Sequence, residues 1–128
     1  MKSFLVTIAV MLVVLLYAST VNSLPIERRG GKRGSFSGEG TFFTVGLGSC
    51  GETSKDSDLV VALSSSKMSS GKYCGKKIKA KGTKGEVTAT VVDTCPSCAE
   101  DDIDFSIGAF KSIGSMATGR IKISWEFE

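Results

Sequence analysis

The chain has 128 residues, four cysteines, no histidine and a formal net charge of +3. Without histidine, Ser-His-Asp catalysis, Cys-His catalysis and His-ligated zinc are excluded. The positive charge belongs mainly to the first 33 residues, since the remainder carries eleven Lys and Arg against twelve Asp and Glu, a net charge of −1. Because phosphate binding needs a basic face, this balance argues against nucleic acid as the main partner.

The N-terminus has the pattern of a secretory signal peptide. Lys2 provides a positive start, residues 4–17 form an apolar run, and Val21 and Ser23 are small residues with the spacing of a cleavage site. The run is too short and wrongly flanked for a membrane span. We therefore predict that residues 1–23 are a signal peptide, that the protein is secreted and extracellular, and that it has no membrane partner.

A predicted disordered leader follows over residues 24–37. It contains two dibasic pairs, Arg28-Arg29 and Lys32-Arg33, which are typical of processing sites in eukaryotic secretion. Incidental charge in a solvated segment is the alternative. The Gly- and Ser-rich stretch 34–40 is predicted to be flexible, and residues 38–128 form a single domain with enough chain for one modest core.

Turn residues and short apolar runs predict a small closed β-barrel of five or six strands. The predicted strands cover residues 41–45, 58–64, 76–81, 86–93 and 119–127. Before the last strand, residues 106–114 predict a brief helix. Ser106 is its expected N-cap, and Ile107, Phe110 and Ile113 lie along one side.

The four cysteines are Cys50, Cys74, Cys95 and Cys98, and in a secreted chain they predict two disulfides. A four-thiolate zinc site matches less well, because only Cys95 and Cys98 have CxxC spacing. That CxxC also has the spacing of a disulfide oxidoreductase, but the acidic loop after it would raise a thiol pKa. We predict a stapled loop. Since no GxGxxG or P-loop motif follows a predicted strand either, we predict no metal and no cofactor.

Carboxylates are the remaining candidates for chemistry. Asp93 ends the strongest predicted strand, and Asp104 lies shortly before the predicted helix. A glycosidase needs two carboxyl groups about 5 Å or about 6.5–9.5 Å apart. The alternative is that both carboxylates bind loop amides or cap the turn and the helix, and both interpretations remain open from sequence.

Four aromatic residues could stack on sugar rings if they were exposed in a row. They are Phe42, Phe43, Tyr73 and Trp125. The alternative is that they fill the core, which the alternating pattern of the last strand favours for Trp125.

Five motifs follow one another over residues 38–127: "GEGTFFTVGLGSCG", "DLVVALS", "YCGKKIKAKG", "VTATVVDTCPSCAEDDIDFSIGAF" and "GRIKISWEF". Their order resembles that of double-psi β-barrel proteins of the expansin, barwin and rare lipoprotein A-like group. The resemblance implies an all-β fold, a six-stranded double-psi β-barrel with one or two short helices and a shallow groove.

The resemblance also implies roles for individual residues. It pairs Cys50 with Cys74 and Cys95 with Cys98. It places Asp93 and Asp104 in the groove as its two acidic positions, with Asp104 as the essential acid. Thr41 or Thr44 is implied as a polar groove residue, and Phe43 is the groove aromatic, which here lacks the hydroxyl of the family's tyrosine.

No catalytic base accompanies these acids, so the expected function is that of a secreted expansin-like protein that binds or loosens cell-wall polysaccharide without hydrolysis. A cysteine-protease inhibitor or host-directed effector on the same barrel is the alternative, acting through loops such as 46–57 or 64–73 on a secreted protease. A third candidate is lytic transglycosylase-like cleavage of peptidoglycan, with Asp104 as the acid. In each case the protein is expected to be a monomer.

Overall fold

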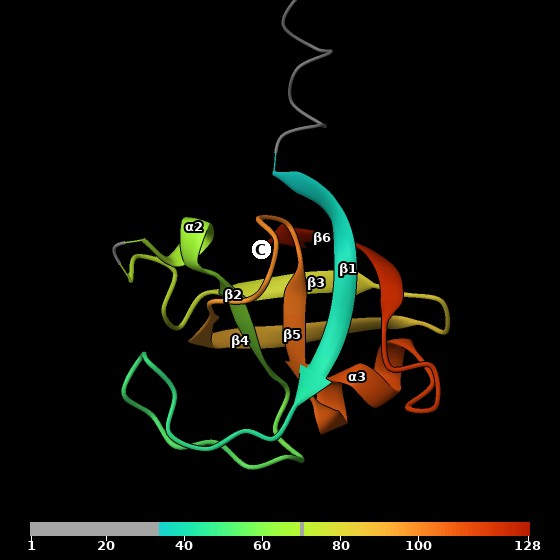
Figure 1. Ribbon diagram of the computed structural model, residues 1–128, viewed down its shortest axis with the longest axis horizontal. Coiled ribbons are helices and arrows are strands. Elements are labelled where there is room, and N and C mark those ends of the chain that lie inside the picture. Colours follow the sequence, from blue (N-terminus) through green and yellow to red (C-terminus); the bar gives the residue numbers. More distant parts are fainter. Residues whose placement is uncertain (1–33, 70) are drawn as a thin grey trace, which may run out of the picture. The chain divides into compact units, whose positions relative to one another are not determined.

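The computed structural model describes residues 34–69 and 71–128, so the predicted signal peptide and the dibasic pairs lie outside the described residues. In the described residues, six strands form a closed barrel in the order β1-β5-β2-β4-β3-β6 (Figure 1). The strands are β1 (Ser35–Phe43), β2 (Val60–Ser64), β3 (Lys77–Lys81), β4 (Glu86–Cys95), β5 (Ile103–Ser106) and β6 (Ile121–Phe127). Two short helices accompany them, α2 (Ser65–Met68) and α3 (Ile107–Ile113). The predicted all-β double-psi barrel is therefore confirmed.

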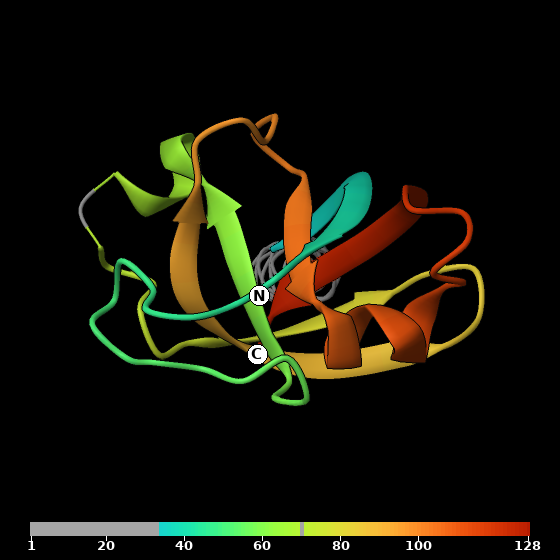
Figure 2. The same ribbon diagram turned by 60° about the horizontal axis from the view of Figure 1, so that its bottom comes forward.

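The barrel mixes parallel and antiparallel pairing. Strand β1 runs parallel to β5, and β2 runs parallel to β4, whereas the other four neighbouring pairs are antiparallel. Parallel neighbours cannot be joined by a tight hairpin, and here other strands separate them in the sequence: β2, β3 and β4 lie between β1 and β5, and β3 lies between β2 and β4. Figure 2 shows the long loop that leads from the end of β1 to the start of β2. Strands that are far apart in the sequence therefore lie side by side.

Alternation along the strands fills the barrel interior. In β3, for example, Ile78 and Ala80 are fully buried while the lysines between them are exposed. The largest fully buried side chains include Leu63, Phe105 and Phe110. Trp125 is only 2 % exposed, so it fills the core as its alternating strand predicts.

Helix α3 begins where the sequence predicts. The Oγ of Ser106 accepts a hydrogen bond from the backbone N–H of Ala109 at 3.2 Å, as an N-cap does. The same hydroxyl donates to the carbonyl of Asp58 at 2.6 Å, which ties the start of the helix to the loop before β2. Phe110 and Ile113 are fully buried, whereas Ile107 is half-buried.

The predicted flexibility of residues 34–40 is wrong, because β1 begins at Ser35 and the barrel starts before the predicted boundary at residue 38. The glycines of this stretch serve close packing. A Cβ at Gly38 would overlap the backbone carbonyl of Asp101, and one at Gly40 would lie 2.9 Å from the ring of Phe105. Glycine within a strand often marks such a close approach of two segments.

The short strand β5 was not predicted. It follows directly after the acidic run at residues 100–102, and its four residues are too few to show an alternating pattern. The acidic run itself is structural. Ser64 Oγ donates to the carbonyl of Glu100 at 2.8 Å, the Lys67 ammonium lies 2.9 Å from an Asp101 carboxylate oxygen, and Asp102 Oδ1 accepts the backbone N–H of Glu39 at 2.9 Å.

Two disulfides join Cys50 to Cys74 and Cys95 to Cys98, the pairing that the family resemblance implies. The first ties the loop between β1 and β2 to the loop between α2 and β3. The second closes the turn at the end of β4, so the CxxC motif staples a loop as predicted.

We expect Gly38→Ala to lower the free energy of unfolding by about 1–3 kcal/mol, since the added methyl group must displace the Asp101 carbonyl. Gly46→Ala is the matched control, because no atom lies within 4 Å of a Cβ built there. Its effect should stay within about 0.5 kcal/mol. Urea unfolding of both variants measures the difference, and equal stabilities would contradict the packing role of Gly38.

Candidate functional site

The strand register brings the two predicted acids into one row. Asp93 on β4 pairs with Ala62 on β2, Ala62 pairs with Asp104 on β5, and Asp104 pairs with Thr41 on β1. We call these four residues the acid row. A shift in register between Val61 and Ala62 brings Asp93 into this alignment. Bulges of this kind re-aim side chains near functional sites.

The acid row faces away from the barrel interior. Its neighbours along the strands, Leu63 and Phe105 among them, are fully buried in the core, and successive side chains of a strand alternate between faces. Two strand spacings place the Cα atoms of Asp93 and Asp104 about 9–10 Å apart. Ala62 stands between the two acids and is itself only 2 % exposed.

Asp104 is the more perturbed acid of the row. Its Oδ1 accepts a hydrogen bond from the Thr41 hydroxyl at 2.8 Å. Partial burial raises the pKa of Asp104 above its ordinary value of 3.8, and the negative charge of Asp93 contributes in the same direction. The Thr41 hydrogen bond and the positive charge of Arg120 oppose this rise. A half-buried carboxyl with a raised pKa is typical of a functional group.

Asp93 is held by backbone amides. Its Oδ1 accepts hydrogen bonds from the N–H groups of Ser49 at 2.9 Å and Thr94 at 2.8 Å. Gly48 makes this approach possible, because a Cβ there would overlap the carbonyl of Val92. Asp93 therefore makes the loop-amide contacts that one interpretation of the acids predicts. Within the described residues, the Asp104 side chain is joined by a hydrogen bond to a hydroxyl and to no amide or helix end.

The remaining predicted groove residues lie around the β1 end of the row. Phe43 is two residues beyond Thr41 on the same face of β1 and is half-buried. Thr44 lies beyond the end of β1 and is exposed, and in the described part of the chain no hydrogen bond joins its side chain to either acid. Of the two candidate threonines, Thr41 is therefore the one whose side chain is hydrogen-bonded to an acid of the row.

Sequence reasoning missed three contributors to this site: Ala62 between the acids, Ser49 as an amide donor, and Gly48 beneath it. None carries a motif of its own, since alanine, serine and glycine occur throughout the chain. Within residues 34–69 and 71–128, no three His, Cys, Asp or Glu side chains are grouped to hold a metal ion. In the same residues, no helix is long and apolar enough to cross a membrane.

A closed six-stranded barrel with this acid row defines the class of the protein as a double-psi β-barrel. A family model of that barrel, described as lytic transglycolase, matches residues 35–125. The match covers most of the chain, and the chain belongs to this family.

Individual relatives are expansins and an inhibitor. The Bacillus subtilis (strain 168) protein Expansin-YoaJ is 39% identical over 51 residues, which are 40% of this chain and 22% of the expansin. A mutant Clavibacter michiganensis expansin, solved in complex with cellohexaose, superimposes with a TM-score of 0.69 at 28% identity over 73% of this chain and 50% of its own. The Streptomyces papain inhibitor gives a TM-score of 0.67 at 26% identity, over 76% of this chain and 94% of its own. The match thus spans half or less of the two expansins and nearly all of the inhibitor.

We expect Asp104→Asn to stabilise the protein increasingly as the pH rises. The raised pKa means that ionising Asp104 costs more in the folded than in the unfolded state. The stability that this carboxyl contributes is therefore full below its ordinary pKa of 3.8 and is lost as the pH rises through the folded-state pKa. Melting temperatures of wild type and variant, from about pH 3 to about pH 8, measure the difference. A difference that does not grow with pH would contradict the raised pKa.

Removing the Thr41 hydroxyl should move the same titration further. Thr41→Val deletes the hydrogen bond that lowers the pKa of Asp104, so we expect that pKa to rise further. The pKa is measured by following the Asp104 carboxyl carbon in an NMR pH titration. Thr44→Val is the matched control and should leave the titration unchanged, whereas equal shifts in the two variants would contradict the role given to Thr41.

Proposed function

We propose that this protein is secreted and binds cell-wall polysaccharide through the acid row, without hydrolysing it. The observation that carries the proposal is the alignment of Asp93, Asp104 and Thr41 on one outward-facing surface. Their oxygens can accept hydrogen bonds from sugar hydroxyls, and the Thr41 hydroxyl can also donate one. An expansin of which this chain matches 50% was solved in complex with cellohexaose, which supports a glycan as the ligand.

The geometry favours binding over hydrolysis. Hydrolysis of a glycosidic bond requires an acid together with a second carboxylate free to act as nucleophile or base. Asp93 already accepts two amide hydrogen bonds at Oδ1, and the acid row contains no third carboxylate. Asp104, with its raised pKa, can instead donate a hydrogen bond when protonated and accept one when ionised.

Secretion fits the covalent structure of the domain. Its two disulfides join all four cysteines of the chain, and such bonds persist in oxidising extracellular environments. The predicted signal peptide at residues 1–23 supports the same location.

The test is a pull-down with insoluble cellulose, chitin and peptidoglycan. Asp104→Asn should weaken binding to the preferred glycan about tenfold, the loss expected when a half-buried charged hydrogen-bonding group is replaced at a binding site. Glu126→Gln is the matched control. It removes one negative charge from an exposed position of β6, and the variant should bind the glycan as wild type does.

Two outcomes would overturn the proposal. If no glycan is retained, or if Asp104→Asn binds as well as wild type, the acid row is not a polysaccharide site. Release of soluble sugar fragments that depends on Asp104 would instead support lytic cleavage, the third candidate function.

A second candidate function is inhibition of a papain-like cysteine protease. Two observations favour it: the similarity to the papain inhibitor spans 94% of that protein, and Leu47 is 75% exposed. Leu47 lies in the loop that the Cys50–Cys74 disulfide anchors, and it pairs with Thr53 in an isolated β-bridge. A rigid loop that presents a large apolar side chain is suited to a protein partner.

Papain inhibition by Leu47→Ala and by Asp104→Asn separates the two candidate functions. If the protein is an inhibitor, Leu47 becomes buried against the protease in the complex. Leu47→Ala should then weaken inhibition about tenfold or more, since truncating an apolar residue at the centre of an interface costs over 1 kcal/mol. Asp104→Asn should inhibit as wild type does. Absence of inhibition at micromolar concentrations of wild type would exclude this candidate.

A further inference from the structure

Beyond Thr41, the acid row meets a positively charged side chain. Strands β1 and β6 are antiparallel, and Gly40 on β1 pairs with Ile121 on β6. In an antiparallel pair, the residue after one partner lies opposite the residue before the other, so Thr41 and Arg120 are neighbours. Gly40 and Ile121 are buried, and successive side chains alternate between faces, so Arg120 shares the outer face with Thr41.

A glutamate on β1 holds the Arg120 side chain. Nη1 of Arg120 donates to Oε1 of Glu39 at 3.0 Å. Glu39 lies two residues before Thr41 on the same face of β1, and its backbone N–H donates to Asp102 Oδ1 at 2.9 Å. The Arg120 and Glu39 side chains are 58% and 42% exposed, so a ligand can reach both. An ion pair this exposed contributes little to stability.

The charge of Arg120 acts on Asp104. Partial burial raises the pKa of Asp104, whereas the hydrogen bond from Thr41 and the positive charge of Arg120 lower it. The charge of Asp93 raises it. The two charged groups that act on Asp104 therefore lie on either side of it: Asp93 beyond Ala62, and Arg120 beyond Thr41.

Arg120 adds hydrogen-bond donors to a row that consists mainly of acceptors. Ionised carboxylates only accept, and the one hydrogen of the Thr41 hydroxyl is directed at Asp104 unless a ligand replaces that contact. A guanidinium has several N–H donors in a planar fork, and its bond to Glu39 uses one of them. Neighbouring hydroxyls of a sugar can each donate and accept. One hydroxyl can therefore donate to Asp104 while the next accepts from Arg120.

We propose that Arg120 extends the acid row as a further ligand-binding residue, which binds the sugar hydroxyl next to the one that Asp104 binds. Glu39 is its positioning residue. The inference rests on the proposed function, because it concerns the same site. It goes further by assigning two residues from outside the predicted groove to that site.

The test measures retention of the protein, expressed from its full chain, on insoluble cellulose, chitin and peptidoglycan. Arg120→Gln should weaken retention on the preferred glycan about tenfold, the loss expected for one charge-assisted hydrogen bond to a ligand. Arg120→Lys keeps the charge without the planar fork and should restore only part of the binding. Glu39→Gln leaves Arg120 without its ionic partner and should weaken retention less than Arg120→Gln does.

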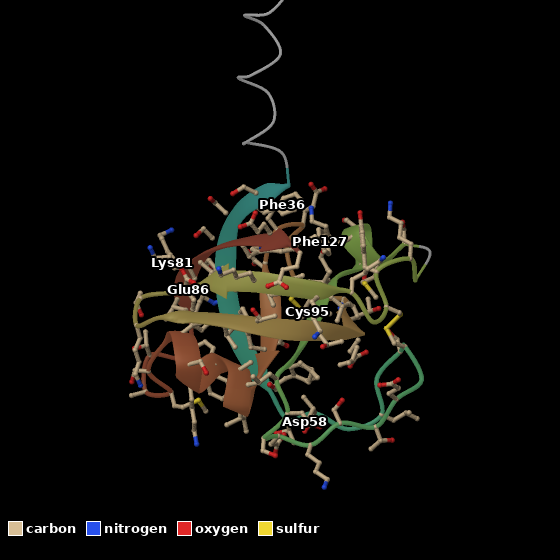
Figure 3. All side chains as sticks on the ribbon, turned by 180° about the vertical axis from the view of Figure 1, so that it is seen from behind. Phe36, Asp58, Lys81, Glu86, Cys95 and Phe127 are labelled. Carbon is tan, nitrogen blue, oxygen red and sulfur yellow. A yellow bond between two sulfur atoms is a disulfide. The ribbon has the colours of Figure 1, made fainter. Side chains whose placement is uncertain are left out.

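Lys79→Gln is the matched control. Lys79 also forms an exposed ion pair with a glutamate, Glu86, at 3.6 Å. Figure 3 shows Glu86 and Cys95 towards opposite ends of β4, and Asp93 lies two residues before Cys95. The control therefore removes the same charge from a similar pair away from the acid row, and it should bind as wild type does. Equal binding of Arg120→Gln and Lys79→Gln would overturn the proposal.

An NMR pH titration of the Asp104 carboxyl carbon provides a readout that needs no glycan. Arg120→Gln should raise the pKa of Asp104 further, because it removes a positive charge that lowers this pKa. Lys79→Gln should leave the titration unchanged. If the Asp104 pKa is the same in Arg120→Gln and wild type, Arg120 does not act on this acid and the proposal is wrong.

The outcomes separate this inference from the proposed function. If Asp104→Asn loses glycan binding and Arg120→Gln keeps it, the acid row binds glycan and only the role of Arg120 is wrong. If wild type is retained on none of the three glycans, the proposed function fails and the role of Arg120 fails with it.

Discussion

The barrel depends on a close approach of three segments at the backbone carbonyl of Asp101. The indole N–H of Trp125 donates to this carbonyl at 2.8 Å, and Gly38 packs so closely against it that no side chain fits. One polar contact thus connects β6, β1 and the loop before β5. Because the partner indole is buried, the hydrogen bond is shielded from water and its loss would leave a polar group unsatisfied.

This contact fixes where β5 begins and therefore which residues it aligns with β1. Asp104 meets Thr41 only in that register, and a shift of one residue would turn Asp104 towards the core. The acidic run before β5 serves the same purpose, since its backbone and carboxylate oxygens bind Ser64, Lys67 and Glu39. Acids that look alike in the sequence thus divide into those that hold the loop and one, Asp104, that faces the outer surface.

The closed barrel provides two different outer surfaces from one core. On one arc, a bulge aligns two half-buried carboxylates on either side of Ala62. On the other arc, ion pairs engage Glu39 and Glu86, which leaves Lys81 and Lys122 free of acidic partners within the described residues. Because side chains along β-strands alternate inward and outward, one buried core can support outward-facing residues of different charge on its two arcs.

The sequence by itself determined the local features: the alternation that buries Trp125, the Ser106 cap of α3, and, through family motifs, the barrel and its cysteine pairing. Each depends on residues that are close in the sequence or on a recognisable motif. Strand β5 escaped prediction because it is short and follows charged residues, and Gly38 was misread because close packing by a distant loop is not visible in composition. Only the tertiary structure decided that the acids join Ala62 and Thr41 in one row, since strand register between distant segments depends on the packing of the whole barrel.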